Sequence, residues 1–208
     1  IEVAAQELAR ADVTLLSGDI TDFGGGSEAA AVLDSLAGRC PRVLGVAGNC
    51  DLRGVEDCLE KRGCNLDGAC VWIGGVAFIG AAGALCNFGR TPNERPEAAF
   101  EEALKCGAAA AKKAEALVVV THHPPYGTKL DLVPPGRHIG SVKLREFIEI
   151  HAPAACLCGH LHDRPGIDYL GGSVIINPGP FAAGRYAYVE LGLGGKVAAA
   201  EIRGSAGR

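Results

Sequence analysis

The sequence predicts a mixed α/β fold in which helices pack on the outside of β-sheets. Short apolar runs alternate with amphipathic segments through the first two thirds of the chain. The last expected strands follow one another with only short turns between them. Hydrophobic residues make up 48% of the chain and charged residues 21%, which is typical of a packed core and excludes a disordered chain. The order of these segments is that of an α/β protein.

Five segments show the apolar spacing and the capping residues that are typical of helices. Ser27 is expected to cap the second of them and Ser141 the last, because a Ser side chain accepts from the free N–H groups of a first helical turn. The expected helices are Glu2–Arg10, Glu28–Ala37, Gly54–Lys61, Glu97–Ala116 and Ser141–His151.

Short apolar runs between and after these helices are expected to form strands, two of them joined in a hairpin at Gly74 and Gly75. The expected strands are Val13–Ser17, Val43–Ala47, Cys70–Ile73, Val76–Gly80, Leu117–Thr121, Ala154–Cys158, Val174–Asn177, Tyr186–Leu191 and Val197–Ile202. Thr128–Gly140 is expected to be a long loop. The chain shows no internal repeat and no linker, so residues 1–208 are expected to form a single domain.

Composition and charge exclude several classes of function. The net charge is −4 and there is no basic block, which excludes a surface for long nucleic acids. No apolar run reaches the ~18–20 residues of a membrane helix. The nine cysteines include no Cys-x-x-Cys pair and most lie in apolar segments, so they indicate buried thiols in a reducing, cytoplasmic compartment.

Four of the expected strands end in the same kind of sequence. A Gly or Thr is followed by Asp, Asn or His in Gly18–Asp22, Gly48–Asp51, Thr121–Pro124 and Gly159–His162. The carboxyl ends of parallel strands meet at one edge of an α/β sheet. Carboxylate, amide and imidazole groups collected at such an edge suit a divalent ion of Mn, Fe, Zn or a similar metal.

Each motif also has a plain structural interpretation. Gly-Asp-x-x-Asp and Gly-Asn-Cys-Asp are common turns, and two adjacent histidines, His122 and His123, fit one buried and one exposed side chain. His160 and His162 are the stronger signal, since alternate residues of an extended segment point to one face. The order of the four motifs, each after an apolar strand, favours a shared site.

The set of motifs resembles the calcineurin-like metallophosphoesterase superfamily. The family pattern is Asp-x-His, Gly-Asp-x-x-Asp, Gly-Asn-His-Asp, a His motif and Gly-His-x-His, and its last four blocks are matched in order between Gly18 and His162. Asn177–Gly179 is similar to the family's closing loop. The resemblance implies a four-layer α/β/β/α sandwich with two mixed β-sheets. It also implies two divalent metal ions (Mn, Fe, Zn or Ni) and hydrolysis of phosphoesters.

Residue by residue, the resemblance implies that Asp19 bridges the two metals. Asn49, His122 and His160 would bind the second metal and His162 the first. Two cations ~3.5–4 Å apart can hold a phosphate between them and activate a water molecule.

The first block of the family pattern, Asp-x-His, is absent. In the family this block ends the first strand, just before the first helix. Ile1–Val3 resembles a stretch that already belongs to that helix. The chain also contains no Met. We therefore expect that the first strand is missing from the chain and that the first metal keeps only Asp19 and His162. Two side chains are fewer than the three that are usual at catalytic zinc sites, so the expectation is an empty or singly metallated, weakly active chain.

Cys50 stands where many members of the family have the His that is taken as the general acid. A thiol with a pKa of about 8.5 is a poorer acid at neutral pH. Some phosphodiesterases of the family resemble this chain in having Gly-Asn-Cys-Asp, so the change is compatible with activity. His123 and His138 are the other candidates for the catalytic acid. The alternative for Cys50 is a small buried spacer.

Arg137 and Ser141 are expected to bind substrate together with Asn49. Arg137 could pair with one phosphate oxygen, and Ser141 at a helix N-terminus could bind another. The alternative is a solvated loop with an ordinary helix cap.

These residues predict a cytoplasmic, metal-dependent phosphoesterase that acts through a metal-activated hydroxide, with phosphodiesters favoured over phosphomonoesters. The alternative is a catalytically weak or inactive protein of the same fold that acts as a protein-binding scaffold. The expected partner is a small phosphoester substrate. Binding to a membrane or to a long nucleic acid is not expected, and the formation of a homo-oligomer is left open.

Overall fold

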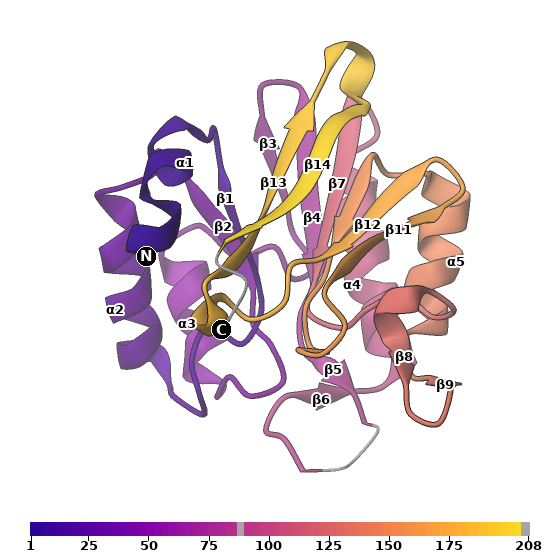
Figure 1. Ribbon diagram of the computed structural model, residues 1–208, viewed down its shortest axis with the longest axis horizontal. Coiled ribbons are helices and arrows are strands. Elements are labelled where there is room, and N and C mark those ends of the chain that lie inside the picture. The colour runs from indigo at the N-terminus through magenta and orange to yellow at the C-terminus, as the bar shows by residue number, and fades with distance from the viewer. Residues whose placement is uncertain (87–89, 205–208) are drawn as a thin grey trace.

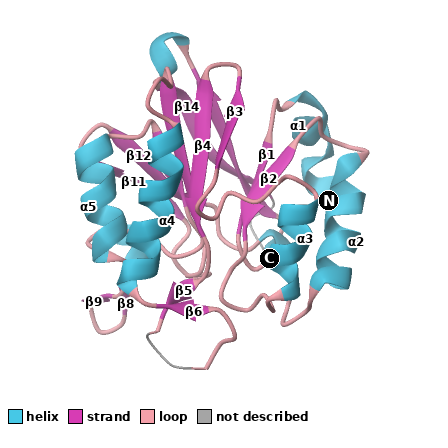
Figure 2. Ribbon diagram, turned by 180° about the vertical axis from the view of Figure 1, so that it is seen from behind, coloured by secondary structure: helices cyan, strands magenta, loops and turns pink. Residues whose placement is uncertain are grey.

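The computed structural model describes residues 1–86 and 90–204 and consists of four layers (Figure 1). One outer layer holds α1 (Ala5–Arg10), α2 (Gly26–Ala37) and α3 (Gly54–Lys61), and the other holds α4 (Glu97–Ala110) and α5 (Val142–His151). Two sheets lie between them, and Figure 2 shows the same order of layers from behind. The expected α/β/β/α sandwich is confirmed.

The larger sheet contains six strands. They are β3 (Cys70–Ile73), β4 (Val76–Ala81), β7 (Ala116–Thr121), β10 (Ala155–Leu157), β11 (Gly166–Leu170) and β12 (Ser173–Asn177). Their order across the sheet is β11-β12-β10-β7-β4-β3. The four inner strands are parallel, and the two edge strands pair antiparallel with their neighbours, so this sheet is mixed as predicted.

The second sheet consists of β1 (Thr14–Ser17) and β2 (Val43–Val46), which pair in parallel. The prediction that both sheets are mixed therefore holds only for the larger one. β13 (Arg185–Leu191) and β14 (Val197–Gly204) form an antiparallel hairpin. Leu191 packs against the core that β2 shares with the larger sheet.

Short elements connect these strands and helices. They are η1 (Glu2–Ala4), β5 (Ala84–Leu85), β6 (Glu94–Arg95), η2 (Lys129–Asp131), β8 (Leu132–Val133), β9 (Arg137–His138), η3 (Phe181–Ala183) and η4 (Leu193–Gly195). β5 pairs with β6, and β8 pairs with β9. The segment predicted as one long loop over Thr128–Gly140 therefore contains a short turn of helix and a two-stranded ribbon.

The larger sheet is buried on both faces, as sheets with parallel inner strands usually are. Successive residues of a strand point to opposite faces, and β7 shows this directly. Val119 joins the core beneath α4 and α5, which includes Leu144. Val118 and Val120 join the core that α2, α3 and β2 share with the sheet, which includes Leu59. The alternation of apolar residues thus places one core on each side of the sheet.

The N-terminus of α2 differs from the sequence prediction. The helix begins at Gly26 rather than at Glu28. Gly25 is the N-cap and Ser27 lies within the first turn, where the Glu28 carboxylate accepts a hydrogen bond from the Gly25 N–H at 2.9 Å.

The end of α4 also differs from the prediction. The helix stops at Ala110 rather than at Ala116, because Ala116 pairs with Val76 as the first residue of β7. Sheet pairing therefore outweighs the helical propensity of the Ala-rich segment. The sequence pattern also does not predict β11, whose residues carry no continuous apolar run.

Within the described residues, no helix is both long enough and apolar enough to cross a membrane. The same part of the chain contains no disulfide, and Cys156 and Cys158 are buried thiols as the sequence predicts.

Leu59→Ala is expected to lower the free energy of unfolding by about 2–5 kcal/mol, because Leu59 of α3 is fully buried between α3 and the sheets. Leu193→Ala is the matched control, since the Leu193 side chain is fully exposed, and it should change the free energy by less than about 0.5 kcal/mol. Urea unfolding of both variants measures the difference. Equal changes in the free energy of unfolding for the two variants would contradict the assignment of Leu59 to the core.

Candidate metal centre

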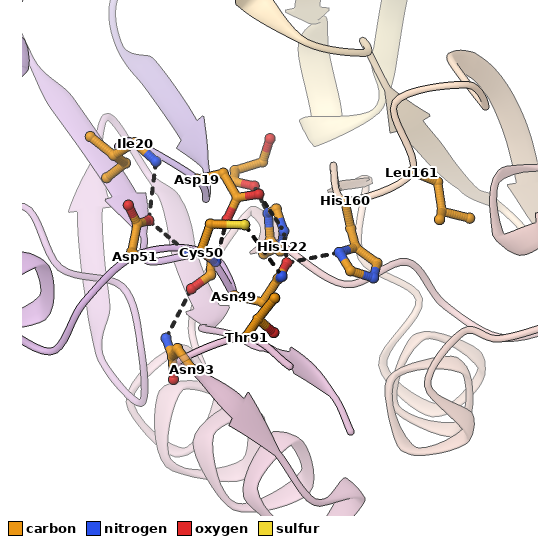
Figure 3. Close-up of polar contacts among 12 residues, drawn as sticks. Asp19, Ile20, Asn49, Cys50, Asp51, Thr91, Asn93, His122, His160 and Leu161 are labelled. Carbon is orange, nitrogen blue, oxygen red and sulfur yellow. Dashed lines mark hydrogen bonds and ion pairs between the residues drawn. The ribbon is translucent and has the colours of Figure 1, made fainter. Parts of the chain in front are cut away.

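Four side chains meet at the edge where β1, β2, β7 and β10 end (Figure 3). Asp19, Asn49, His122 and His160 each follow one of these strands. Asn49 lies between the two histidines: its Oδ1 is 2.8 Å from His122 Nε2 and 2.8 Å from His160 Nδ1. Asp19 Oδ2 lies 3.4 Å from His122 Nε2. The structure thus brings together four of the five residues that the sequence suggests as metal ligands.

The His122 ring is held with its Nε2 facing the other three side chains. Its Nδ1 lies 2.8 Å from the Ser17 carbonyl oxygen, which only accepts, so Nδ1 carries the proton. In a neutral imidazole Nε2 is then an acceptor, and it faces Asn49 Oδ1 and Asp19 Oδ2, which are acceptors too. The neutral His122 ring thus presents an acceptor toward two acceptor oxygens, an arrangement that fits a bound cation.

The spacing of these atoms also fits a shared ion. Bonds from zinc to nitrogen or oxygen are about 2.0–2.2 Å long, so two ligand atoms at right angles around one ion are about 3 Å apart. The observed separations of 2.8 Å and 3.4 Å lie on either side of that value. In the described part of the chain no group of three His, Cys, Asp or Glu side chains is poised to hold a metal, so the Asn49 amide oxygen is an essential member of this set.

Burial keeps His160 in the form that binds metals. Loss of contact with solvent, and then the neighbouring imidazoles of His122, His123 and His162, lower the pKa of His160 to about 2. His160 is therefore neutral at physiological pH, and neutral imidazole is the ligating form.

Two of the four side chains leave the backbone at strained positions. Asp19 and His160 have positive φ angles of 47° and 66°, which are uncommon for residues other than Gly and are typical of functional sites. Gly18 and Gly48 leave the space that this arrangement needs. A Cβ on Gly18 would collide with the His122 ring, and a Cβ on Gly48 would collide with the Asp19 carboxylate.

Asp51 joins two of the loops that carry these side chains (Figure 3). It is 1% exposed, so its carboxylate relies on protein donors. It accepts from the N–H groups of Gly48 at 2.8 Å, Ile20 at 3.0 Å and Thr21 at 2.8 Å, and from the Thr21 hydroxyl at 2.7 Å. One carboxylate thereby fixes the segment after Asp19 against the segment before Asn49.

His162 and His123 lie in contrasting surroundings. His162, the fifth predicted ligand, is exposed and lies close enough to His160 to influence its pKa. His123 is fully buried, with its Nε2 2.8 Å from the Ile139 carbonyl oxygen, and burial lowers its pKa to about 4. An enclosed imidazole that is neutral at physiological pH counts against His123 as the catalytic acid.

Cys50 borders the four-residue group. Its N–H donates to Asp19 Oδ1 at 2.9 Å, and its Sγ accepts from Asn49 Nδ2 at 3.5 Å. Burial, and then the Asp19 carboxylate, raise the pKa of the Cys50 thiol to about 12. A general acid works best with a pKa near the operating pH, so these surroundings favour the alternative of a packing residue that helps to place Asp19.

At the start of α5, a carboxylate competes with the predicted phosphate contact of Ser141. Ser141 caps this helix as expected, because its Oγ accepts from the Leu144 N–H at 3.0 Å. The same Oγ donates to the Glu97 carboxylate at 2.6 Å, and this carboxylate also accepts from the N–H groups of Val142 and Lys143. A carboxylate already occupies the helix N-terminus, which counts against Ser141 as a phosphate ligand.

Arg137 and His138 form β9, and their contacts are with residues outside the four-residue group. The Nδ1 of His138 is 2.7 Å from the buried carboxylate of Asp131, and its ring packs beside Tyr126. Arg137 is exposed. The structure gives neither residue a contact with Asp19 or with the other three side chains, so their proposed roles lack support from this geometry.

Two contributors to the site escape sequence reasoning. One is the Ser17 carbonyl group, because a backbone oxygen carries no sequence signal. The other is Asn93, whose Nδ2 donates to the Gly48 carbonyl oxygen at 3.0 Å (Figure 3). Asn93 lies outside every motif, and a single Asn in a loop gives no indication of such a contact.

Comparisons with known proteins identify the family of the chain. A family model described as calcineurin-like phosphoesterase matches residues 1–164. A protein of Methanocaldococcus jannaschii, described as uncharacterized protein MJ1162, is 36% identical over 174 residues, which are 82% of this chain and 78% of that protein.

Solved structures share the fold. TT1561 of Thermus thermophilus superposes with a TM-score of 0.72 at 19% identity, over 97% of this chain and 89% of that one. The Thermus thermophilus sulfate thiohydrolase SoxB, in complex with glycerol, gives a TM-score of 0.58 at 20% identity, over 92% of this chain and 38% of that one. At these identities the likeness concerns the fold alone. Since the family model covers most of the chain, the protein belongs to the calcineurin-like phosphoesterase family, whose members generally use divalent metal ions.

Proposed function

We propose that this chain hydrolyses phosphoesters with a divalent metal ion held by Asp19, Asn49, His122 and His160. The observation that carries the proposal is the convergence of three acceptor atoms, which follows from the bond between His122 Nδ1 and the Ser17 carbonyl. When bound, the ion supplies Lewis acidity, which polarises a phosphoryl oxygen and lowers the pKa of a coordinated water.

The other residues of the proposed site hold and orient these ligands. Asp51 fixes the two loops that carry Asp19 and Asn49, so the ligand atoms are positioned before any ion arrives. Ser17 fixes the orientation of the His122 ring. His162 is proposed as a ligand of a second ion that would share Asp19, as the family resemblance implies.

Small phosphodiesters are the proposed substrates. Neither Cys50 nor His123 has surroundings that suit a proton donor, so the leaving group would have to depart with little help from an acid. Esters of acidic alcohols or phenols meet that condition. We place the enzyme in the reducing cytoplasm, a location that buried free thiols such as Cys156 and Cys158 support.

A protein-binding scaffold on the same fold is the second candidate function. Cys50 at the position of the catalytic acid and the enclosed His123 favour it. The grouping of Asp19, Asn49, His122 and His160 opposes it, because a scaffold that never binds metal gains nothing from acceptor atoms placed around one point. The amount of metal bound per chain separates the two functions.

Asp19→Asn is expected to weaken Mn²⁺ binding by more than about tenfold, because it removes the only carboxylate among the four ligands. Isothermal titration calorimetry and elemental analysis measure the affinity and the metal content. Asp34→Asn is the matched control, since Asp34 is exposed and pairs with Arg62 on the surface. Equal Mn²⁺ affinities of the two variants and the unchanged chain would rule out the assigned ligand.

Hydrolysis of bis(p-nitrophenyl) phosphate should fall to background when a chelator removes the metal, and should return on addition of Mn²⁺. Release of p-nitrophenolate measures the rate, with p-nitrophenyl phosphate as the monoester comparison. A metal-loaded chain that hydrolyses neither ester would contradict the proposed activity and favour the scaffold.

Cys50→Ser is expected to retain the rate on bis(p-nitrophenyl) phosphate within about threefold, because p-nitrophenolate leaves without a proton. Cys50→His should raise the rate on a phosphodiester with an alkyl leaving group, since imidazolium can protonate the departing oxygen. The ratio of the two rates in each variant is the measurement. A loss of about a hundredfold or more in Cys50→Ser that is confined to the ester with the alkyl leaving group would instead identify the thiol as the acid.

A further inference from the structure

Asn93 holds the loop that carries Asn49 through its carbonyl groups, whereas Asp51 holds it through the Gly48 N–H. Its N–H donates to the Asn49 carbonyl oxygen at 3.1 Å, and its Nδ2 donates to the Gly48 carbonyl oxygen at 3.0 Å (Figure 3). These bonds engage the two consecutive carbonyl groups of the loop. They leave the Asn49 side chain free to face His122 and His160.

Arg95 sets the direction of the Asn93 amide. Its Nε donates to Asn93 Oδ1 at 3.0 Å, so the Asn93 Nδ2 must point the other way, toward Gly48 and the Glu56 carboxylate. The Arg95 guanidinium is itself held by two carboxylates, that of Asp67 at 2.7 Å and that of Glu56.

This network connects separate parts of the fold behind the metal centre. Glu56 belongs to α3, Arg95 to β6, and Asp67 lies before β3, where its Oδ1 also accepts from the Ala82 N–H at 2.9 Å. The side chains of Arg95, Glu56 and Asp67 are 21%, 27% and 18% exposed, so they are largely withdrawn from solvent. Buried ion pairs of this kind add little net stability but can fix one arrangement of the groups around them.

We propose that Asn93 and Arg95 are positioning residues that hold Asn49 in the geometry for metal binding. The inference rests on the proposed function, because it requires that Asn49 Oδ1 binds the ion. Neither Asn93 nor Arg95 is among the four proposed ligands, so both would act through the Gly48–Asn49 backbone. Loss of either side chain frees the loop to rotate, and the Asn49 oxygen then leaves the point on which His122 and His160 converge.

Charge and geometry give opposite expectations for two substitutions. Asn93→Asp keeps the oxygen that Arg95 binds but removes the donor to Gly48, and it adds a negative charge near the ion. Arg95→Met removes a positive charge near the ion. Electrostatic attraction alone therefore predicts tighter metal binding in both variants. The positioning role predicts weaker binding, by about 10–100-fold as for other residues that orient metal ligands.

The experiment titrates Co²⁺ into the full chain and its variants, and follows the visible absorption spectrum, which reports the ligands around the ion. Asn93→Asp and Arg95→Met should bind Co²⁺ about 10–100-fold more weakly and with an altered spectrum. Arg95→Lys should resemble Arg95→Met, since an ammonium group keeps the charge but cannot contact Asn93, Asp67 and Glu56 in the same planar geometry.

Arg203→Met is the matched control. Arg203 also pairs with two carboxylates, those of Glu7 and Glu201, but it lies on β14 and has no contact with the metal centre. This variant should keep the affinity and spectrum of the unchanged chain, and thermal unfolding should show whether each variant is folded.

The outcomes separate this inference from the proposed function. If the unchanged chain fails to bind Co²⁺, the proposed metal centre is wrong. If the unchanged chain binds Co²⁺ and the folded Asn93→Asp and Arg95→Met variants bind it equally or more tightly, the positioning role is wrong while the metal centre stands.

Discussion

The hydrogen bond from His122 Nδ1 to the Ser17 carbonyl determines what the site can do. In the neutral ring it leaves His122 Nε2 as an acceptor that faces two further acceptors, Asn49 Oδ1 and Asp19 Oδ2. With the proton on Nε2, His122 would donate to Asn49 and the cluster would be an ordinary buried polar contact. Because His122 is 1% exposed, solvent offers little alternative partner for the ring.

The strands of the two sheets position the proposed metal ligands, and hydrogen bonds from neighbouring side chains hold the loops that carry them. Parallel strands of the two sheets carry the four side chains at their carboxyl ends, and Asp51 and Asn93 then hold the Asn49 loop through its N–H and carbonyl groups. The positive φ angles of Asp19 and His160 cost free energy, of order 1–3 kcal/mol each. Packing of the cores on both faces of the larger sheet offsets this strain. Ligands held in place before an ion binds lose less freedom when it arrives.

The sequence indicated residues that belong to a recognisable motif. It did not indicate residues whose role depends on partners far away along the chain. The alternation of strands and helices predicted a mixed α/β fold, and the polar residues after four strands predicted a shared site. The four layers and the ligand set of Asp19, Asn49, His122, His160 and His162 came from the family resemblance. No local pattern indicated that Glu97, from the start of α4, would occupy the N-terminus of α5 and compete there with the phosphate expected at Ser141. Asn93 and its partner Arg95 depend on contacts across several elements, which no local pattern encodes.

Anomalous diffraction at the manganese absorption edge, from crystals of the chain grown with Mn²⁺, tests the central claim most directly. We predict an anomalous peak bonded to Asp19, Asn49 Oδ1, His122 Nε2 and His160 Nδ1, with His122 Nδ1 still on the Ser17 carbonyl. A peak bonded to other residues, or His122 and Asn49 in direct hydrogen bond with no ion beside them at saturating Mn²⁺, would contradict this claim.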